Sequence, residues 1–321
     1  MHILFITTGG TIGSVIKGSY TGTSDEPSLL ILDAFKKKYP ETFNNINFEI
    51  MTPFITLSEN MSGEKISFLT KLVKEKAKED FDGIVVTHGT DTLSYTAAAL
   101  MLSLDPDCIP VCFVSSDKPL SDPEACGTDN LKAAADIINA GMRGVYVPYR
   151  NHNGTVYIHR PLYLTEADIY DDELRSIGTM HVCTSDNNIL SPNTLYDDSK
   201  YRDCLLKLSE TLPSASEMTD VFPEPAKHIL RLKAFPGMKY PDISSEIRYI
   251  IFESFHSGTL NTESEDTHAF CLEAYEKNIP VYITGTVKGI TYESTKSFDK
   301  LHLIPVPDIT PASLYMRLWC S

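Results

Sequence analysis

Short apolar runs alternate with longer amphipathic segments through the first half of the chain. Runs of four or five apolar residues bounded by glycine or polar residues are typical of strands that are buried on both faces. Apolar residues that recur every three or four positions are typical of helices that cover a sheet. The pattern predicts strands at Ile3–Thr7, Gly83–Thr87, Ile109–Ser115 and Gly144–Tyr149 and helices at Gly63–Asp80, Leu93–Leu104 and Asp129–Gly141. Because strands and helices alternate, we expect a parallel sheet with helices on both faces.

The alternation fades after Asp186 and resumes at Ile229. Polar clusters and prolines fill residues 186–226, and the one helix predicted there is short and lies near Lys200–Leu208. Such a segment is typical of a connection between domains. The resumed pattern predicts strands at Ile229–Leu232, Tyr249–Glu253 and Val281–Thr284 and helices at Ser244–Arg248, Asp266–Lys277 and Pro311–Trp319.

A chain of 321 residues is long enough for about two domains. We predict an α/β fold with a larger N-terminal parallel-sheet domain over residues 1–190, which is expected to be catalytic, and a smaller C-terminal α/β domain over residues 227–321. Residues 191–226 are the predicted connection. No apolar stretch approaches the ~20 residues of a membrane span, and the opening MHILFITTGG lacks the pattern of a secretory signal peptide. We therefore expect a cytoplasmic protein.

The chain is acidic, with 43 Asp and Glu residues against 28 Lys and Arg residues and a formal net charge of -15. Binding to nucleic acid or to an anionic membrane surface draws on clustered Lys and Arg, so both kinds of partner are disfavoured. The seven cysteines form no CxxC pair and are odd in number, which argues against a disulfide framework and against a zinc site. We expect scattered buried thiols in a reducing compartment.

Two loops rich in glycine and threonine follow predicted strands and carry the candidate chemistry. They are TTGGTIGS at residues 7–14 and THGTDT at residues 87–92. In open parallel sheets, active sites lie at the carboxyl ends of the strands. The first loop lacks both the Gly-Lys-Ser/Thr ending of a phosphate loop and the GxGxxG of a dinucleotide site, so a dinucleotide-dependent oxidoreductase is disfavoured. Taken singly, each loop also fits a structural role, the first as a turn and the second as a helix N-cap.

Taken together, the two loops resemble the two signatures of bacterial-type L-asparaginases and related glutaminases. The stretches that carry the resemblance are TGGTIGS at residues 8–14 and GIVVTHGTDTLSYTAAAL at residues 83–100, in the order that the family has. Further similarity lies in Ser58–Met61, in the helix start at Asn130 and in HILRLKAFPGM at residues 228–238. The resemblance covers nearly the whole chain and implies the two-domain fold of that family, with no metal and no organic cofactor.

The resemblance implies an amidohydrolase that cleaves the side-chain amide of L-asparagine through a threonine acyl-enzyme and releases L-aspartate and ammonia. It leaves L-glutamine open as a second substrate. The implied catalytic residues are Thr11 as the nucleophile, Tyr20 on a lid as its activating partner, and the pair Thr90 and Asp91. A neutral threonine hydroxyl is a weak nucleophile, so an activating partner is a chemical requirement.

The resemblance also implies a set of substrate-binding residues. Glu59, together with Asp91, would bind the α-ammonium of the substrate, and Ser58 would bind its α-carboxylate. Backbone N–H groups at the two glycine-containing loops would stabilise the oxyanion, and the carbonyl of Ser116 would contact the scissile amide. The full implied substrate-binding set is Gly10, Ser58, Glu59, Gly89 and Ser116.

The implied assembly is a homodimer or a homotetramer with the active site near a subunit boundary. The stretch FHSGTLN in the second domain resembles a family loop that reaches the site of a neighbouring subunit. His256 and Asn261 are therefore candidate contacts in trans, although a solvated loop histidine is the simpler interpretation of His256.

One catalytic position departs from the family pattern. The family pairs its second threonine and aspartate with a lysine from a later loop, but here Tyr163 or Leu164 occupies that position. Three interpretations follow: a lysine from another loop (Lys17, Lys118 or Lys288) reaches the site, Tyr163 substitutes for it, or activity is weak or lost. The last interpretation defines an alternative function, a protein of this fold that binds an amino acid as a regulatory module.

Overall fold

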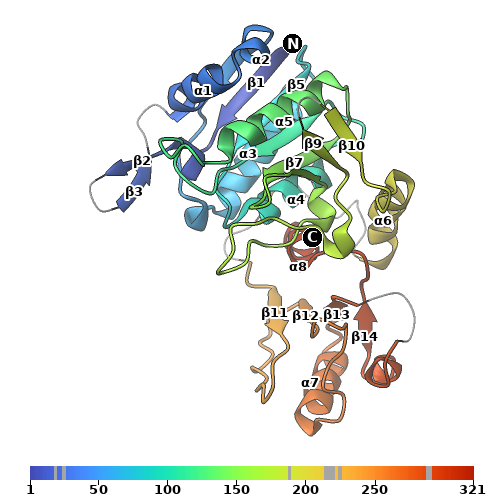
Figure 1. Cartoon of the computed structure of the whole chain (residues 1–321). Helices are drawn as coiled ribbons and strands as arrows, with labels where there is room; N and C mark the ends of the chain where they lie inside the picture. The colour runs from blue at the N-terminus through green and yellow to red at the C-terminus, as the bar shows by residue number, and fades with distance from the viewer. Residues whose placement is uncertain (18–19, 24–26, 187–188, 213–220, 223–225, 287–290) are drawn as a thin grey trace. The chain divides into compact units, whose positions relative to one another are not determined.

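The computed structural model describes residues 1–17, 20–23, 27–186, 189–212, 221–222, 226–286 and 291–321 (Figure 1). The chain divides into two compact units, Met1–Leu205 and Leu206–Ser321. The division lies inside helix α6 (Asp198–Thr211), in the segment that the sequence assigns to the connection. Each unit contains its own sheet.

The first unit is built on an eight-stranded sheet with the strand order β10-β9-β8-β7-β6-β5-β1-β4. Its strands are β1 (His2–Thr7), β4 (Asn47–Met51), β5 (Gly83–Thr87), β6 (Val111–Val114), β7 (Val145–Arg150), β8 (Val156–His159), β9 (Cys183–Asp186) and β10 (Ile189–Pro192). The five strands from β4 to β7 are parallel, whereas β7, β8, β9 and β10 pair in antiparallel fashion. The sheet is therefore mixed, and the prediction of a parallel sheet is wrong for β8 to β10. Only residues 151–155 join β7 to β8, which is too short for a helical crossover.

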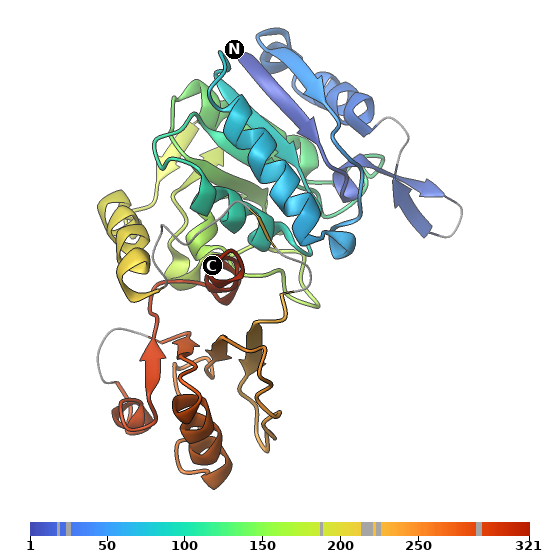
Figure 2. The same cartoon turned by 180° about the vertical axis from the view of Figure 1, so that it is seen from behind.

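Helices cover both faces of this sheet, as predicted. They are α1 (Pro27–Lys38), α2 (Pro40–Asn44), α3 (Gly63–Lys76), α4 (Leu93–Ser103) and α5 (Gly127–Asn139). Figure 1 shows α1 and α5 in front of the strands, and the reverse view in Figure 2 shows α3 and α4 on the other side. The side chains of Phe5, Val85 and Val114 pack in one buried cluster with those of α1 and α5.

A hairpin and several short turns complete the first unit. Strands β2 (Ser14–Lys17) and β3 (Tyr20–Thr23) form a two-stranded antiparallel hairpin. In its described residues the unit also has four single 3₁₀ turns, namely η1 (Thr11–Gly13), η2 (Ser58–Asn60), η3 (Pro161–Tyr163) and η4 (Ile177–Thr179). The turns η1 and η2 lie within the predicted site segments.

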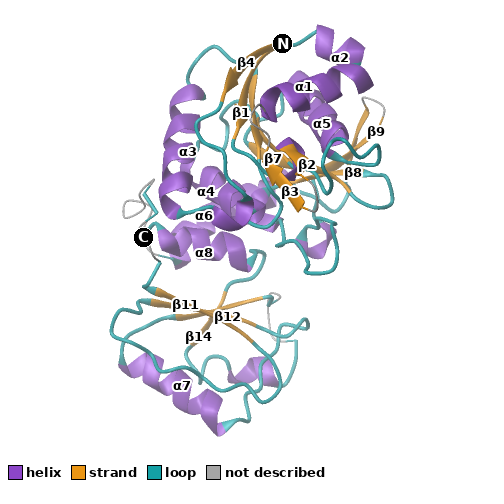
Figure 3. Ribbon diagram, turned by 90° about the vertical axis from the view of Figure 1, so that its left-hand side faces the viewer, coloured by secondary structure: helices purple, strands orange, loops and turns teal. Residues whose placement is uncertain are grey.

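The second unit contains a four-stranded parallel sheet in the order β11-β12-β13-β14 (Figure 3). Its elements are β11 (Ile229–Lys233), β12 (Tyr249–Glu253), α7 (Glu265–Glu276), β13 (Val281–Thr284), η6 (Ser294–Ser297), β14 (Leu303–Pro305) and α8 (Pro311–Trp319). The helix predicted at Ser244–Arg248 is wrong. That segment makes a single turn, in which the N–H of Ile247 donates to Ser244 O at 3.2 Å, and the N–H of Arg248 then donates to His228 O at 2.8 Å.

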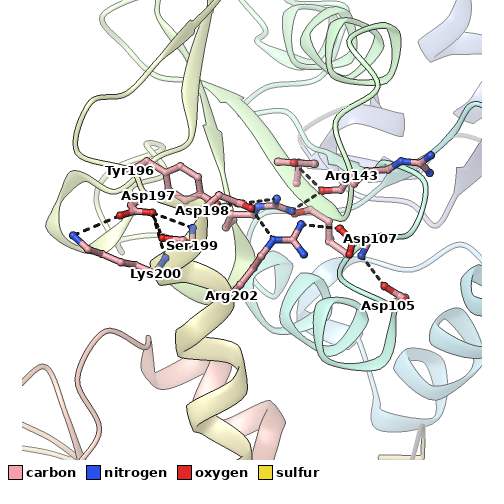
Figure 4. A network of polar contacts seen from close by, with 12 residues as sticks. Asp105, Asp107, Arg143, Tyr196, Asp197, Asp198, Ser199, Lys200 and Arg202 are labelled. Carbon is pink, nitrogen blue, oxygen red and sulfur yellow. Dashed lines mark hydrogen bonds and ion pairs between the residues drawn. The ribbon is translucent and has the colours of Figure 1, made fainter.

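A buried arginine anchors the start of α6 to the first unit. The guanidinium of Arg160 lies 4.7 Å from the ring centroid of Tyr201 and 3.3 Å from Oδ1 of Asp198. Oδ2 of Asp198 accepts a hydrogen bond from Nε of Arg202 at 2.8 Å, and Arg202 also donates to Asp107 at 2.7 Å (Figure 4). Within the described residues, no helix is long and apolar enough to cross a bilayer.

Candidate active site

The two predicted loops meet at their glycines. A Cβ placed on Gly10 would lie 2.5 Å from the nitrogen of Gly89 and 2.6 Å from the carbonyl carbon of His88, so the two backbones are in direct contact. Gly10 has φ 87 and ψ 172, a conformation that is essentially confined to glycine. Gly9, with φ 111, packs equally closely on Thr56. Only glycine permits this approach, which explains the Gly-Gly pair before Thr11.

Two threonines hold the strand ends together. Oγ1 of Thr8 donates to the carbonyl oxygen of Thr87 at 2.5 Å, and the N–H of Thr8 donates to Oγ1 of Thr87 at 3.2 Å. Both side chains are buried. Thr8 and Thr87 therefore have a structural role, whereas Thr11, one turn further on, is partly exposed to solvent.

The turn η2 contacts the second loop and is the third segment of the site. Oγ of Ser58 donates to Oδ2 of Asp91 at 2.7 Å, and Oγ1 of Thr92 donates to the carbonyl oxygen of Ser58 at 2.9 Å. A Cβ on Gly89 would lie 2.5 Å from Oγ of Ser58. Ser58 is buried, while the carboxylates of Asp91 and Glu59 lie at the surface. The predicted residues Gly10, Ser58, Gly89 and Asp91 are thus brought together through a chain of contacts.

Ser116 lies beside η1. A Cβ on Gly127 would lie 3.0 Å from both Cγ1 of Ile12 and Cβ of Ser116, which places the Ser116 loop against the residue that follows Thr11. Oγ of Ser116 donates to the carbonyl oxygen of Lys118 at 2.6 Å and accepts from the N–H of Gly127 at 3.2 Å. These two bonds show that the Ser116 hydroxyl has a structural role in this loop.

Tyr20 opens strand β3, and its backbone pairs with that of Lys17. The side chains of Tyr20 and Lys17 lie outside the described structure, as does the whole of Lys288. The amine of Lys118 lies 2.9 Å from Oε2 of Glu124. The ring of Tyr163 is buried, with its centroid 5.8 Å from that of Tyr201 on α6.

A carboxylate from the loop after η3 forms a hydrogen bond with a residue of α4. Oε2 of Glu166 accepts a hydrogen bond from the hydroxyl of Tyr95 at 2.5 Å, and Tyr95 follows Asp91 by one helical turn of sequence. This pair was not predicted from the sequence. The helical spacing between Asp91 and Tyr95 was a signal that Tyr95 lies near the site, but nothing in the sequence pairs Tyr95 with Glu166.

His88 is buried and supports the second loop. Its Nδ1 lies 2.8 Å from the carbonyl oxygen of Gly89 and donates to it when the ring is neutral. Burial lowers the pKa of His88 to about 4. A neutral ring in this position fixes the Gly89 peptide and is not suited to proton transfer near pH 7.

Cys126 is a packed thiol. Its sulfur accepts hydrogen bonds from the N–H of Asp117 at 3.4 Å and from Nδ2 of Asn130 at 3.2 Å. Burial raises its pKa to about 12, so the thiolate is absent at neutral pH. None of the seven cysteines forms a disulfide, and two of them, Cys108 and Cys204, are only partly buried.

His256 and Asn261 belong to the second unit. His256 is exposed, and Oδ1 of Asn261 accepts from the N–H of Glu263 at 3.3 Å. Their contact with a site in trans stays a prediction. Within the described residues, no cluster of three or more His, Cys, Asp or Glu side chains could hold a metal ion.

The family described as "Asparaginase, N-terminal" matches residues 2–180, more than half of the 321 residues. The chain belongs to the asparaginase family. The predicted family is thereby confirmed, and the asparaginase-family match spans every residue of the first-unit site described above.

Relatives of this asparaginase-family protein include components of amidotransferases. It is 28% identical over 335 residues to a glutamyl-tRNA(Gln) amidotransferase component of Metallosphaera sedula, covering 98% of this chain and 71% of that protein. The corresponding component of the Methanobrevibacter smithii amidotransferase is 25% identical over 334 residues, covering 99% of this chain and 71% of that protein.

Solved structures confirm the asparaginase fold. The thermostable L-asparaginase from Thermococcus kodakarensis has a TM-score of 0.75 at 20% identity, covering 99% of this chain and 92% of that chain. L-asparaginase I from Vibrio cholerae has a TM-score of 0.74 at 19% identity with the same coverage. The predicted α/β asparaginase-like fold is therefore confirmed over nearly the whole chain.

Proposed function

We propose that this asparaginase-family protein is an amidohydrolase that converts L-asparagine to L-aspartate and ammonia, with L-glutamine as a side substrate. The observation that carries the proposal is the direct contact of the two strand-end loops at Gly10 and Gly89, with Ser58 bonded to Asp91 beside them. This arrangement supports a single small site that contains a partly exposed threonine hydroxyl, backbone N–H groups and two carboxylates.

The proposed reaction has two steps. The hydroxyl oxygen of Thr11 attacks the carboxamide carbon and its proton passes to a base. The base then gives this proton to the amide nitrogen, and the C–N bond breaks as the nitrogen leaves as ammonia. Water then attacks the resulting ester, which releases L-aspartate and restores the Thr11 hydroxyl. Tyr20 is the proposed hydrogen-bonding partner of that hydroxyl, and the pair Thr90 and Asp91 is the proposed second catalytic group.

Binding follows from charge and from backbone geometry. The carboxylates of Asp91 and Glu59 favour the α-ammonium, and Ser58 favours the α-carboxylate. Backbone N–H groups at Gly10, Thr11 and Thr90 are the proposed oxyanion hole, and loss of one such donor typically lowers kcat by ~10²–10³. We also propose a cytoplasmic homodimer or homotetramer in which a partner's copy of the second unit completes the site.

A second candidate function is that of one component in a larger amidotransferase. Relatives that are 24–28% identical over nearly the whole chain are components of glutamyl-tRNA(Gln) amidotransferases, which favours this candidate. In that function, the isolated chain would turn over free L-asparagine poorly and would need its partner for full activity. The amino-acid-binding regulatory module is a third outcome, in which ligand binds without turnover.

Ammonia release by the purified chain tests these functions. We expect steady turnover of L-asparagine and slower turnover of L-glutamine, and a loss of at least ~10³-fold in kcat for Thr11→Ala. Thr194→Ala, at an exposed threonine that follows β10 and lies outside every proposed site segment, is the matched control and should keep the wild-type rate. Absence of turnover together with a thermal shift on adding L-aspartate would overturn the enzyme proposal in favour of a binding protein.

A further inference from the structure

The side chain of Lys65 bridges the two ends of the segment that contains Ser58 and Glu59. Lys65 lies in the first turn of α3, three residues after the N-cap Ser62. Its Nζ donates to Oγ1 of Thr56 at 3.0 Å and to the carbonyl oxygen of Asn60 at 2.8 Å. One ammonium group thus joins both ends of the segment that contains η2.

Both hydrogen-bond partners of the Lys65 ammonium are uncharged oxygens. Its two partners are a hydroxyl and a carbonyl oxygen, and within the part of the chain that the structure describes no acidic side chain pairs with Nζ. An ammonium has three donors, so one N–H remains beyond these two bonds.

The position of this charge suits a substrate carboxylate at Ser58. A 3₁₀ turn rises ~2 Å per residue, so both ends of η2 lie within roughly 6 Å of each other. An ammonium that contacts both flanks therefore lies within about one Debye length, ~8 Å, of Ser58. At that separation its attraction for a carboxylate at Ser58 is only partly screened.

We propose that Lys65 is a specificity-determining residue of this site: its ammonium positions the Ser58 turn and favours substrates that carry a free α-carboxylate. The inference rests on the proposed function. The acidic groups of Asp91 and Glu59 would take the ammonium end of a zwitterionic substrate, and the Lys65 side of the turn would take its carboxylate end. A substrate without the carboxylate gains nothing from the Lys65 charge.

The test compares two substrates and three variants. L-asparagine carries the carboxylate, whereas 3-aminopropanamide is the same molecule without it. Lys65→Met keeps the aliphatic stem and removes the charge, Lys65→Arg keeps the charge, and Lys71→Met removes an exposed lysine of the same helix as a control. Thermal unfolding of each variant verifies folding.

For Lys65→Met we expect KM for L-asparagine to rise about tenfold with kcat within about threefold, and kinetics with 3-aminopropanamide to stay unchanged. Lys65→Arg should restore most of the loss, and Lys71→Met should match the wild type. An equal rise in KM for both substrates would overturn the proposal, because Lys65 would then only stabilise the turn and would not discriminate between substrates. Unchanged KM for L-asparagine would overturn it as well.

Binding separates this inference from the proposed function. Calorimetry on Thr11→Ala and on Thr11→Ala with Lys65→Met measures the affinity for both compounds in the absence of turnover. If the wild type shows no turnover but Lys65→Met weakens L-asparagine binding alone, the hydrolase proposal fails and the role of Lys65 in ligand selection stands. If the wild type turns over and the two affinities fall equally, only the inference about Lys65 fails.

Discussion

Gly10→Ala places a methyl group where the two strand-end loops touch. The new Cβ would lie 2.5 Å from the nitrogen of Gly89 and 2.6 Å from the carbonyl carbon of His88. Both are backbone atoms, so the loops must move apart to relieve the overlap. The backbone conformation costs a non-glycine residue on the order of 1–3 kcal/mol, and overpacking costs about 1–3 kcal/mol. We therefore expect the free energy of unfolding to fall by roughly 2–6 kcal/mol and turnover to be lost.

Gly154→Ala is the matched control. Gly154 also has a positive φ, +80 against +87 at Gly10, but nothing lies within 4 Å of a Cβ there. It should lose only the conformational part, roughly 1–2 kcal/mol, and keep its activity. Urea denaturation gives the stabilities, and ammonia release gives the rates. If Gly10→Ala is no less stable than Gly154→Ala and turns over at the wild-type rate, the close contact of the loops is wrong.

Three further predictions concern the site and the first unit. Ser58→Ala removes the 2.7 Å bond to Asp91 and should raise KM by ~10–100-fold with little change in stability; an unchanged KM would show that this bond does not shape the binding site. Burial lowers the pKa of His88 to about 4 and that of His159 to about 3. Below pH 6.5 these two histidines therefore bind protons in the unfolded chain but stay neutral in the folded chain. The free energy of unfolding should therefore fall between pH 6.5 and pH 4, by roughly 1.4 kcal/mol per pH unit for each histidine, and a flat profile in urea titrations would contradict this. Arg160→Lys keeps a positive charge but loses the planar fork and the ring contact, so we expect a loss of roughly 1–3 kcal/mol in urea; wild-type stability would mean that charge alone suffices.

The central strands of the first sheet could be predicted because β5 and β6 are buried at every position and therefore carry continuous apolar runs. The edge strands could not. β4 and β10 are largely exposed, and their sequences mix polar and apolar residues without a clear period. β4 pairs with β1, which is distant in sequence (His2 lies opposite Asn47), and local patterns do not encode such a pairing, whereas β10 pairs with the preceding strand β9.

Two helix predictions differ from the structure for opposite reasons. Helix α1 was missed, although Pro27 at its start and the lysines at its end are typical signals of helix termini. The segment Ser244–Arg248 was predicted to be helical, but five residues make little more than one turn. The cost of nucleating a helix exceeds what so short a segment recovers, and its last residue instead leads into β12.

The site loops were predictable because glycine and threonine at strand ends are local features. Their partners were not. The bond between Ser58 and Asp91 joins residues 33 positions apart, and the bond between Tyr95 and Glu166 joins residues 71 positions apart. Lys65 lies in a predicted helix, and nothing in the sequence pairs its ammonium with Thr56 and Asn60.

The most direct test of a threonine-based amide hydrolysis is to trap the covalent intermediate. Trypsin should cut after Lys17, so the peptide of residues 1–17 contains Thr11. After rapid acid quenching of the enzyme during turnover of L-asparagine, mass spectrometry of that peptide should show an aspartyl ester on Thr11, which is absent from Thr11→Ala. Turnover that persists in Thr11→Ala, or an ester found on another residue, would contradict the account.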